Sequence, residues 1–228
     1  MSPASGTILS ARGLSKFHGQ GLNKVHALNH VDIDVHAGDL TVICGPSGSG
    51  KSTLLNMLGL LDPPDSGSIT IDGAMVHLQD ATALERLRRE RFGFVFQNFN
   101  LVPVLTAVEN VELPLYVLPM KAAQRRARAT ELLEAVGLAD RLHHRPSELS
   151  GGQQQRVAIA RALVRSPLLV FADEPTANLD SITSEHLLDL VIRLNVQFGT
   201  AFVVATHDPR VIHRARRVCH IADGVLQS

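Results

Sequence analysis

The chain has 228 residues, 45% of them hydrophobic, so it can fill one sizeable folded core. Lysine plus arginine and aspartate plus glutamate each total 22. No net charge therefore draws the whole molecule to nucleic acid, and no nucleic-acid partner is expected. The longest apolar runs are strand-sized, far below the ~20 residues that a membrane span requires. If a membrane is involved, we expect another polypeptide to cross it.

The N-terminal residues 1–10 lack a basic stretch followed by an apolar one, so we expect no secretory signal and a cytoplasmic location. The two cysteines, Cys44 and Cys219, lie in apolar surroundings and have neither metal-site nor disulfide-framework spacing. We interpret both as small core residues.

The first half of the chain alternates between strand and helix patterns. Apolar residues alternate over 31–35, which predicts a half-exposed strand, and 40–44 reads as a buried strand before a glycine-rich turn. A helix is expected from 51 to about 60. The run 68–73 ends in an Asp-Gly turn that suits an antiparallel hairpin, and 92–96 predicts another buried strand.

Strand patterns nearly disappear over 98–165, where apolar residues follow a helical period that is broken by prolines and a glycine. We interpret this stretch as an inserted helical subdomain. Strand patterns return at 168–172, 201–205 and 218–221, with an amphipathic helix expected over 183–198. Strand, helix and strand in series predict parallel pairing.

A phosphate-binding pattern, G-x-x-x-x-G-K-[ST], spans 45–52 between the predicted buried strand and the predicted helix. Its glycines let the backbone wrap an anion at a helix N-terminus. Lys51 adds a charge at the β/γ position, and Ser52 is placed to hold Mg²⁺. The predicted nucleotide-binding residues of this loop are Gly45, Ser47, Gly48, Ser49, Gly50, Lys51, Ser52 and Thr53.

Several predicted buried strands end in polar residues, and in a parallel sheet such ends converge on one crevice. Asp173 is expected to be a second carboxylate near Mg²⁺. Its neighbour Glu174, on extended backbone, would point elsewhere and act as the catalytic base. Alone, Gln97 is more often a loop residue and His207 a satisfied histidine. Beside a phosphate loop, both become catalytic candidates, and Gln97 a candidate metal ligand as well.

A second glycine motif, LSGGQ, spans 149–153 and precedes a predicted helix that a serine opens. This helix start is also suited to an anion. Since one nucleotide has one γ-phosphate, already gripped by Lys51, the second motif has no evident ligand within its own chain. A second protomer would supply one.

Here the sequence resembles the ABC ATPase family, in which LSGGQ is the signature motif that closes over nucleotide bound to the opposite subunit. A chance LSGGQ in this length is on the order of one in several thousand at average residue frequencies. The resemblance implies ATP contacts from Ser150, Gly151, Gly152 and Gln153. It also implies that Phe17 stacks on adenine, that Gln97 is the Q-loop glutamine and that Asp173-Glu174 ends the Walker B motif. Asp180 would be the D-loop aspartate and His207 the switch histidine.

From this resemblance we expect one α/β domain with a P-loop NTPase (RecA-like) core, a mostly parallel sheet and an N-terminal antiparallel β subdomain. Residues 1–97 and 165–228 would form the nucleotide-binding core and 98–164 the helical subdomain. The implied cofactors are ATP and Mg²⁺. The implied partners are a second copy of the chain, as a homodimer, and an integral membrane permease at the inner face of the cell membrane.

Within the family, the segments 98–114, 145–148 and the Asn-Leu-Asp variant at 178–180 look like the branch that serves lipoprotein release, macrolide export and related peptide transport. Three other functions stay open. They are a soluble ABC ATPase of DNA repair, chromosome maintenance or translation, a regulatory cell-division ATPase, and a small-molecule kinase. Two arginine clusters, at 86–91 and 125–128, share helices with acidic residues and fit solvated helix faces. Phe17 fits a simple core aromatic as well as an adenine contact.

Overall fold

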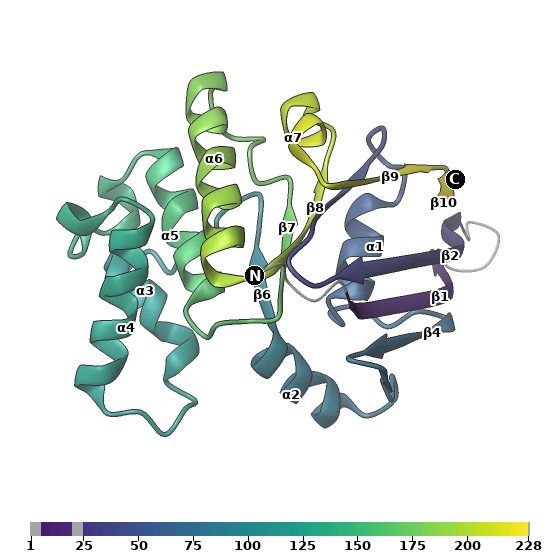
Figure 1. Cartoon of the computed structure of the whole chain (residues 1–228), viewed down its shortest axis with the longest axis horizontal. Helices are drawn as coiled ribbons and strands as arrows, with labels where there is room; N and C mark the ends of the chain where they lie inside the picture. Colours follow the sequence, from purple (N-terminus) through teal and green to yellow (C-terminus); the bar gives the residue numbers. More distant parts are fainter. Residues whose placement is uncertain (1–5, 20–24, 228) are drawn as a thin grey trace.

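The computed structural model describes residues 6–19 and 25–227, which form two sheets with helices around them (Figure 1). The first half of the chain contains six strands and two helices: β1 (Thr7–His18), β2 (Val25–His36), β3 (Leu40–Cys44), α1 (Lys51–Leu58), β4 (Ser66–Ile71), β5 (Ala74–Met75), α2 (Ala81–Arg91) and β6 (Phe92–Val95).

Between β6 and β7, the chain forms helices and short 3-10 turns. These elements are α3 (Ala107–Glu112), η2 (Leu113–Leu115), α4 (Ala122–Ala135), η3 (Ala139–Arg141), η4 (Pro146–Glu148) and α5 (Gly151–Leu163). The remaining elements are β7 (Leu169–Asp173), α6 (Ser181–Phe198), β8 (Ala201–Thr206), α7 (Pro209–Arg214), β9 (Arg217–Ala222) and β10 (Val225–Gln227).

The larger sheet has six strands in the order β10-β9-β3-β8-β7-β6. All neighbours pair in parallel except β10, which returns antiparallel to β9. The parallel pairing predicted for the last third of the chain is therefore confirmed. Because parallel strands point the same way, the ends of β3, β6, β7 and β8 meet at one edge of this sheet.

The central strands β3, β7 and β8 are buried on both faces of the larger sheet, which is why they are continuous apolar runs. Val42, Val170 and Val204 pack into a core shared with α3, α4, α5 and α6. Alternate residues such as Phe171 and Val203 pack on the opposite face, against α1 and the smaller sheet. The period of two thus divides one sheet between two cores.

The smaller sheet is antiparallel, with the order β2-β1-β4-β5, and lies across α1 from the larger one (Figure 1). The predicted half-exposed strand is part of β2, where Val31, Ile33 and Val35 are buried. The expected α/β architecture, with a mostly parallel sheet and an N-terminal antiparallel region, is confirmed.

Helix boundaries follow local capping. The helix expected from residue 51 to about 60 ends at Leu58, because Gly59 as C-cap has a ψ of 2° and Leu60 a left-handed φ of 58°. The helix expected from 183 begins at Ser181, because Asp180 caps it by accepting the Thr183 N–H. It ends at Gly199, whose φ of 64° is left-handed.

The cysteines are placed differently. Cys44 is buried at the end of β3, while Cys219 on β9 is only partly buried, so the core interpretation holds fully for Cys44 alone. Both are free thiols. Across residues 6–19 and 25–227, no helix is both long and apolar enough to cross a bilayer.

Candidate functional site

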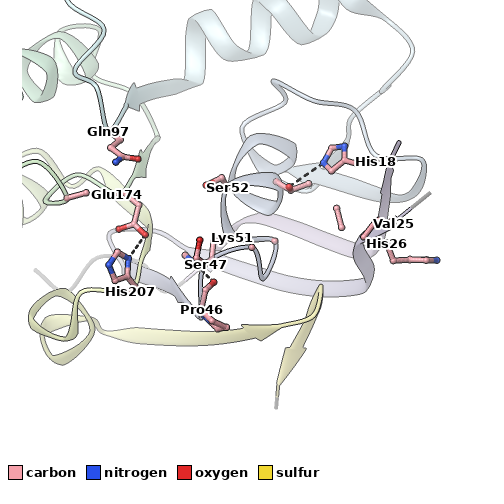
Figure 2. Close-up of a pocket in the computed structure, with 15 residues that line it drawn as sticks. His18, Val25, His26, Pro46, Ser47, Lys51, Ser52, Gln97, Glu174 and His207 are labelled. Atoms are coloured by element: carbon pink, nitrogen blue, oxygen red, sulfur yellow. Dashed lines mark hydrogen bonds and ion pairs between the residues drawn. The ribbon is translucent and has the colours of Figure 1, made fainter. Parts of the chain in front are cut away.

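A cleft of about 650 Å³ opens where the predicted polar residues converge (Figure 2). The turn after β3 forms its floor, and the residues that follow β6, β7 and β8 form one wall. The predicted site residues on its lining are Ser47, Gly48, Gly50, Lys51, Ser52, Thr53, Gln97, Glu174 and His207. Segments far apart in the sequence therefore meet at one crevice.

Two glycines of the phosphate loop lie where no side chain fits. A Cβ on Gly45 would stand 2.1 Å from the carbonyl oxygen of Ile221 in β9. Gly50 has a φ of 105°, and a Cβ there would stand 2.6 Å from the carbonyl oxygen of Ala27 in β2. Only glycine lets the loop pass this close to both strands.

Lys51 is folded back along the loop. Its Nζ donates hydrogen bonds of 2.9 Å to the carbonyl oxygens of Gly45 and Pro46, and the residue is 7% exposed. Within the described chain, no side chain caps the N-terminus of α1 at Gly50. The first N–H groups of this helix therefore face the cleft beside a cation, which is the arrangement that binds a phosphate.

Ser52 and Asp173 meet below the loop, where the Ser52 hydroxyl donates a 2.9 Å hydrogen bond to Asp173 Oδ1. Burial raises the pKa of Asp173, and the Ser52 hydroxyl partly opposes that shift. A carboxylate and a hydroxyl beside a phosphate site fit Mg²⁺, which takes few protein oxygens and completes its shell with phosphates and water. These two side chains would hold the ion.

Glu174 corrects one part of the sequence argument. It was expected on extended backbone, but β7 ends at Asp173 and Glu174 has a left-handed φ of 43°. The Glu174 N–H still makes the last ladder bond to β8, at 2.9 Å to the carbonyl of Ala205, and the backbone turns directly after it. The two carboxylates still face different partners, although the turn, and not strand alternation, separates them.

The Glu174 carboxylate is held at both oxygens. The Thr206 hydroxyl donates to Oε2 at 2.9 Å, and His207 Nδ1 lies 2.8 Å from Oε1 (Figure 2). Because a carboxylate only accepts, His207 must carry its proton on Nδ1. The ring stays 71% exposed while Glu174 is 14% exposed, so the histidine stands between the carboxylate and the open cleft.

Gln97 lies on the wall of the cleft, and its side chain is among those that line it (Figure 2). Its backbone carbonyl accepts a 2.9 Å hydrogen bond from the side-chain amide of Asn178. The start of the helical stretch after β6 is thereby tied to the segment that follows Glu174.

Phe17 is not on the lining of the cleft. It packs against His26, with ring centroids 3.8 Å apart, and its backbone N–H donates to Asp65. His26 and His18 line the cleft instead, and His18 Nε2 lies 3.5 Å from the Thr53 hydroxyl. Sequence reasoning missed both histidines, because a lone histidine beside a strand has no distinguishing pattern.

The signature turn, residues 150–153, lies away from the cleft. Ser150 caps α5 by accepting the Gln153 N–H at 3.3 Å, and the Gln153 side chain accepts the Ser150 N–H at 2.9 Å. A Cβ on Gly152 would stand 2.4 Å from Thr183 Cγ2, so this turn packs tightly on the start of α6. Gly151 lies beside Leu179. The structure thus brings this motif to the 177–183 segment and not to Lys51.

Asp180 lies in the same region. It accepts the Thr183 N–H at 3.0 Å and the Thr183 hydroxyl at 2.6 Å, and these hydrogen bonds lower the pKa of the carboxyl. Neither Asp180 nor the four residues of the signature turn line the cleft of Figure 2. The predicted site residues therefore form two separate groups.

Comparisons with known proteins show the family of this chain. The ABC transporter family model matches residues 28–177. The chain is 44% identical over 226 residues to the lipoprotein-releasing system ATP-binding protein LolD of Shewanella denitrificans, covering 99% of this chain and 97% of that protein. It is 47% identical over 224 residues to a macrolide export ATP-binding/permease protein MacB of Paracoccus denitrificans. That match covers 98% of this chain but 33% of the MacB protein.

Among solved structures, the fold matches a dimeric, post-hydrolysis state of the ATP-binding cassette MJ0796 bound to ADP and Pi. The TM-score is 0.88 at 43% identity, with 97% of each chain covered. The chain therefore belongs to the ABC transporter family, as an ATP-binding, ATP-hydrolysing cassette that resembles the lipoprotein-releasing and macrolide-export branch.

Proposed function

We propose that two copies of this chain close head to tail over two ATP molecules, each held by the phosphate loop of one copy and the signature turn of the other. The observation that carries this proposal is the separation between the residues of the cleft and the signature turn, residues 150–153. Lys51 lines the cleft, whereas Ser150 and its neighbours pack on α6 outside it. Two anion-ready helix N-termini that cannot share one phosphate within a chain can share it across a dimer.

Each residue of the cleft has a role in this proposal. Lys51 and the N-terminus of α1 bind the β- and γ-phosphates, while Ser52 and Asp173 hold Mg²⁺, with Gln97 as a further ligand. Mg²⁺, when bound, neutralises charge on the phosphate oxygens. The oxygens of Ser52 and Asp173 are already 2.9 Å apart, so little rearrangement is needed.

Glu174 acts as the base. It takes a proton from the water that attacks the γ-phosphorus, the bond from that phosphorus to the ADP oxygen breaks, and ADP and phosphate result. In the structure His207 holds the Glu174 carboxylate by 2.8 Å. His207 therefore orients the base and is exposed enough to contact the γ-phosphate as well.

Closure and reopening would drive a separate permease from the inner face of the membrane. In that step, the helical stretch 98–164 moves as a unit with Gln97 at its base. The substrate would be a lipoprotein, a peptide or a drug-like molecule that is exported or extracted. Sequence similarity to LolD and to one third of MacB supports this part of the proposal. Copurification of a membrane protein with the tagged chain tests it.

The decisive experiment is Glu174→Gln with ATP, followed by size-exclusion chromatography. We expect dimers to accumulate, because ATP binds and is not hydrolysed. Glu174→Gln combined with Lys51→Ala is the control and should stay monomeric with ATP. Failure of the single variant to dimerise at saturating ATP would overturn the head-to-tail model.

A further inference from the structure

One ion pair holds both ends of the segment that follows Glu174. Asp208 accepts a 3.1 Å hydrogen bond from the Thr176 hydroxyl, and Arg210 donates a 3.1 Å hydrogen bond to the carbonyl oxygen of Ser181. Asp208 and Arg210 bond to each other with Nη2 to Oδ2 at 2.7 Å. The four residues 177–180, which we call the D-loop, lie between these two anchor points.

Asp208 has no acceptor site to spare. Its Oδ1 accepts the backbone N–H and the Nε–H of Arg210, both at 2.9 Å. Its Oδ2 accepts the Thr176 hydroxyl and Arg210 Nη2. The Asp208 side chain is 10% exposed, and the Arg210 guanidinium holds the pKa of this carboxyl below its usual range. The Asp208 carboxylate is therefore held by several donors at once, and we call the Asp208–Arg210 pair the clasp, although the Arg210 side chain is 32% exposed.

The clasp is also joined to the reacting groups. Asp208 follows His207 directly, and its backbone N–H donates to the Thr206 hydroxyl at 3.1 Å. The same hydroxyl donates to Glu174 Oε2 at 2.9 Å. A chain of hydrogen bonds therefore runs from the Glu174 carboxylate, through Thr206 and Asp208, to both ends of the D-loop.

We propose that Asp208 and Arg210 are positioning residues that fix the D-loop relative to Glu174 and His207, so that the state of the γ-phosphate site sets the D-loop position offered to the partner copy. The inference rests on the head-to-tail dimer proposed above. The role requires a guanidinium, because its planar group donates to the Asp208 carboxylate and to the Ser181 carbonyl at the same time. A lysine ammonium is a point charge without this fixed geometry.

The first test needs no dimer. Hydrogen exchange of the monomer reports the D-loop through the amides of Ala177 and Leu179, which donate to the carbonyls of Glu174 and Thr176. We expect Arg210→Gln and Arg210→Lys to speed exchange across 175–182 about tenfold. Unchanged exchange in either variant would overturn the clasp.

Arg214→Gln is the matched control. Arg214 lies on the same short helix, α7, has a side chain 35% exposed against 32% for Arg210, and also reaches α6, where it pairs with Asp189. It touches neither end of the D-loop in the hydrogen bonds of the described chain. We expect parental exchange across 175–182 in this variant, and an equal increase there would overturn the specific role of Arg210.

The second test measures coupling. In the Glu174→Gln background, Arg210→Gln should weaken ATP-driven dimerisation about tenfold, while ATP affinity of the monomer stays within twofold. In the otherwise native chain, kcat should fall with KM for ATP unchanged. Parental dimerisation, or an equal loss of monomer ATP affinity, overturns the inference. If Glu174→Gln alone does not dimerise, the proposed function fails instead, and the exchange experiment still decides on the clasp.

A double-mutant cycle with Thr176→Val sharpens the assignment. Thr176 is 3% exposed, and valine keeps its shape without the hydroxyl. If Thr176 and Arg210 act through the same carboxylate, their effects on dimerisation are not additive. Additive effects would show that the two anchor points work separately and would overturn the single clasp.

Discussion

The phosphate loop and the signature turn are both glycine-rich helix starts, yet they differ in what they offer an anion. At α1, Gly50 provides no side-chain cap among the described residues, so the first N–H groups and Lys51 face the cleft. At α5, Ser150 and Gln153 cap each other, so the Gln153 N–H is already taken by the Ser150 hydroxyl oxygen. In the part of the chain that the structure describes, the first helix start has no side-chain cap, whereas the second is partly capped.

The capped turn still offers a side-chain donor. Ser150 Oγ accepts the Gln153 N–H, so the hydroxyl hydrogen remains free to point at a phosphate, and the residue is exposed. The comparison teaches that similar glycine motifs can divide a task. One wraps the anion with backbone and a cation, and the other presents a fixed hydroxyl. Variants of both regions test this division.

The largest effect is expected from Lys51→Ala, which removes the cation from the phosphate loop. Hydrolysis should fall about 10²–10³-fold, since no other cation lines the floor of the cleft in the described residues. Steady-state ATPase assays with thermal unfolding as a folding control measure this. Hydrolysis at the parental rate would contradict the assignment of the phosphate loop.

Ser150→Asp separates the cap from the phosphate contact. Aspartate caps a helix as well as serine does, so the melting temperature should be kept or slightly raised. Its charge would repel the γ-phosphate of the partner's ATP, and like charges at an interface cost several kcal/mol. We expect ATP-driven dimerisation to weaken about 10²-fold while the monomer binds ATP normally. Ser150→Asn, a neutral cap, is the control and should lose less.

The smallest effects concern two aspartates, one in each region. Burial raises the pKa of Asp173, so the charged carboxylate destabilises the fold above that pKa. Asp173→Asn should therefore raise the melting temperature of the ATP-free protein at pH 7 by about 1–3 °C. The gain should shrink as pH falls toward 4.

The pKa of Asp180 is lowered, so its charge stabilises the fold above about pH 4 and this contribution is lost below.

Melting curves of Asp173→Asn, Asp180→Asn and the parent between pH 3.5 and 7 check these opposite trends. Asp173→Asn should also lose hydrolysis, because it removes a proposed Mg²⁺ ligand. A melting temperature of Asp173→Asn below that of the parent at pH 7 would contradict the cost assigned to its burial.

Sequence patterns predicted the elements whose signals are local. The buried strands around 42, 170 and 203 are continuous apolar runs because both faces of their sheet are covered. The helix after the phosphate loop follows from the motif itself. Boundaries moved by a few residues where caps decided them, as at Gly59 and Asp180.

Other features depend on distant contacts and were out of reach. The left-handed backbone of Glu174 comes directly after the last ladder bond between β7 and β8, so alternation along β7 could not reveal it. The short helix α7 and the clasp that it carries have no periodic signal. Phe17 was placed by motif order, but the packing of its ring on His26 is a tertiary contact.

The close approach of Gly50 to the carbonyl of Ala27 has a consequence for how the family can diverge. On the β2 side the contact is made by the main-chain oxygen of residue 27, so it does not depend on which amino acid stands there. A substitution there leaves the touching oxygen in place, whereas any side chain at residue 50 must displace a strand. We therefore expect no co-variation between positions 27 and 50, even though they are neighbours in space.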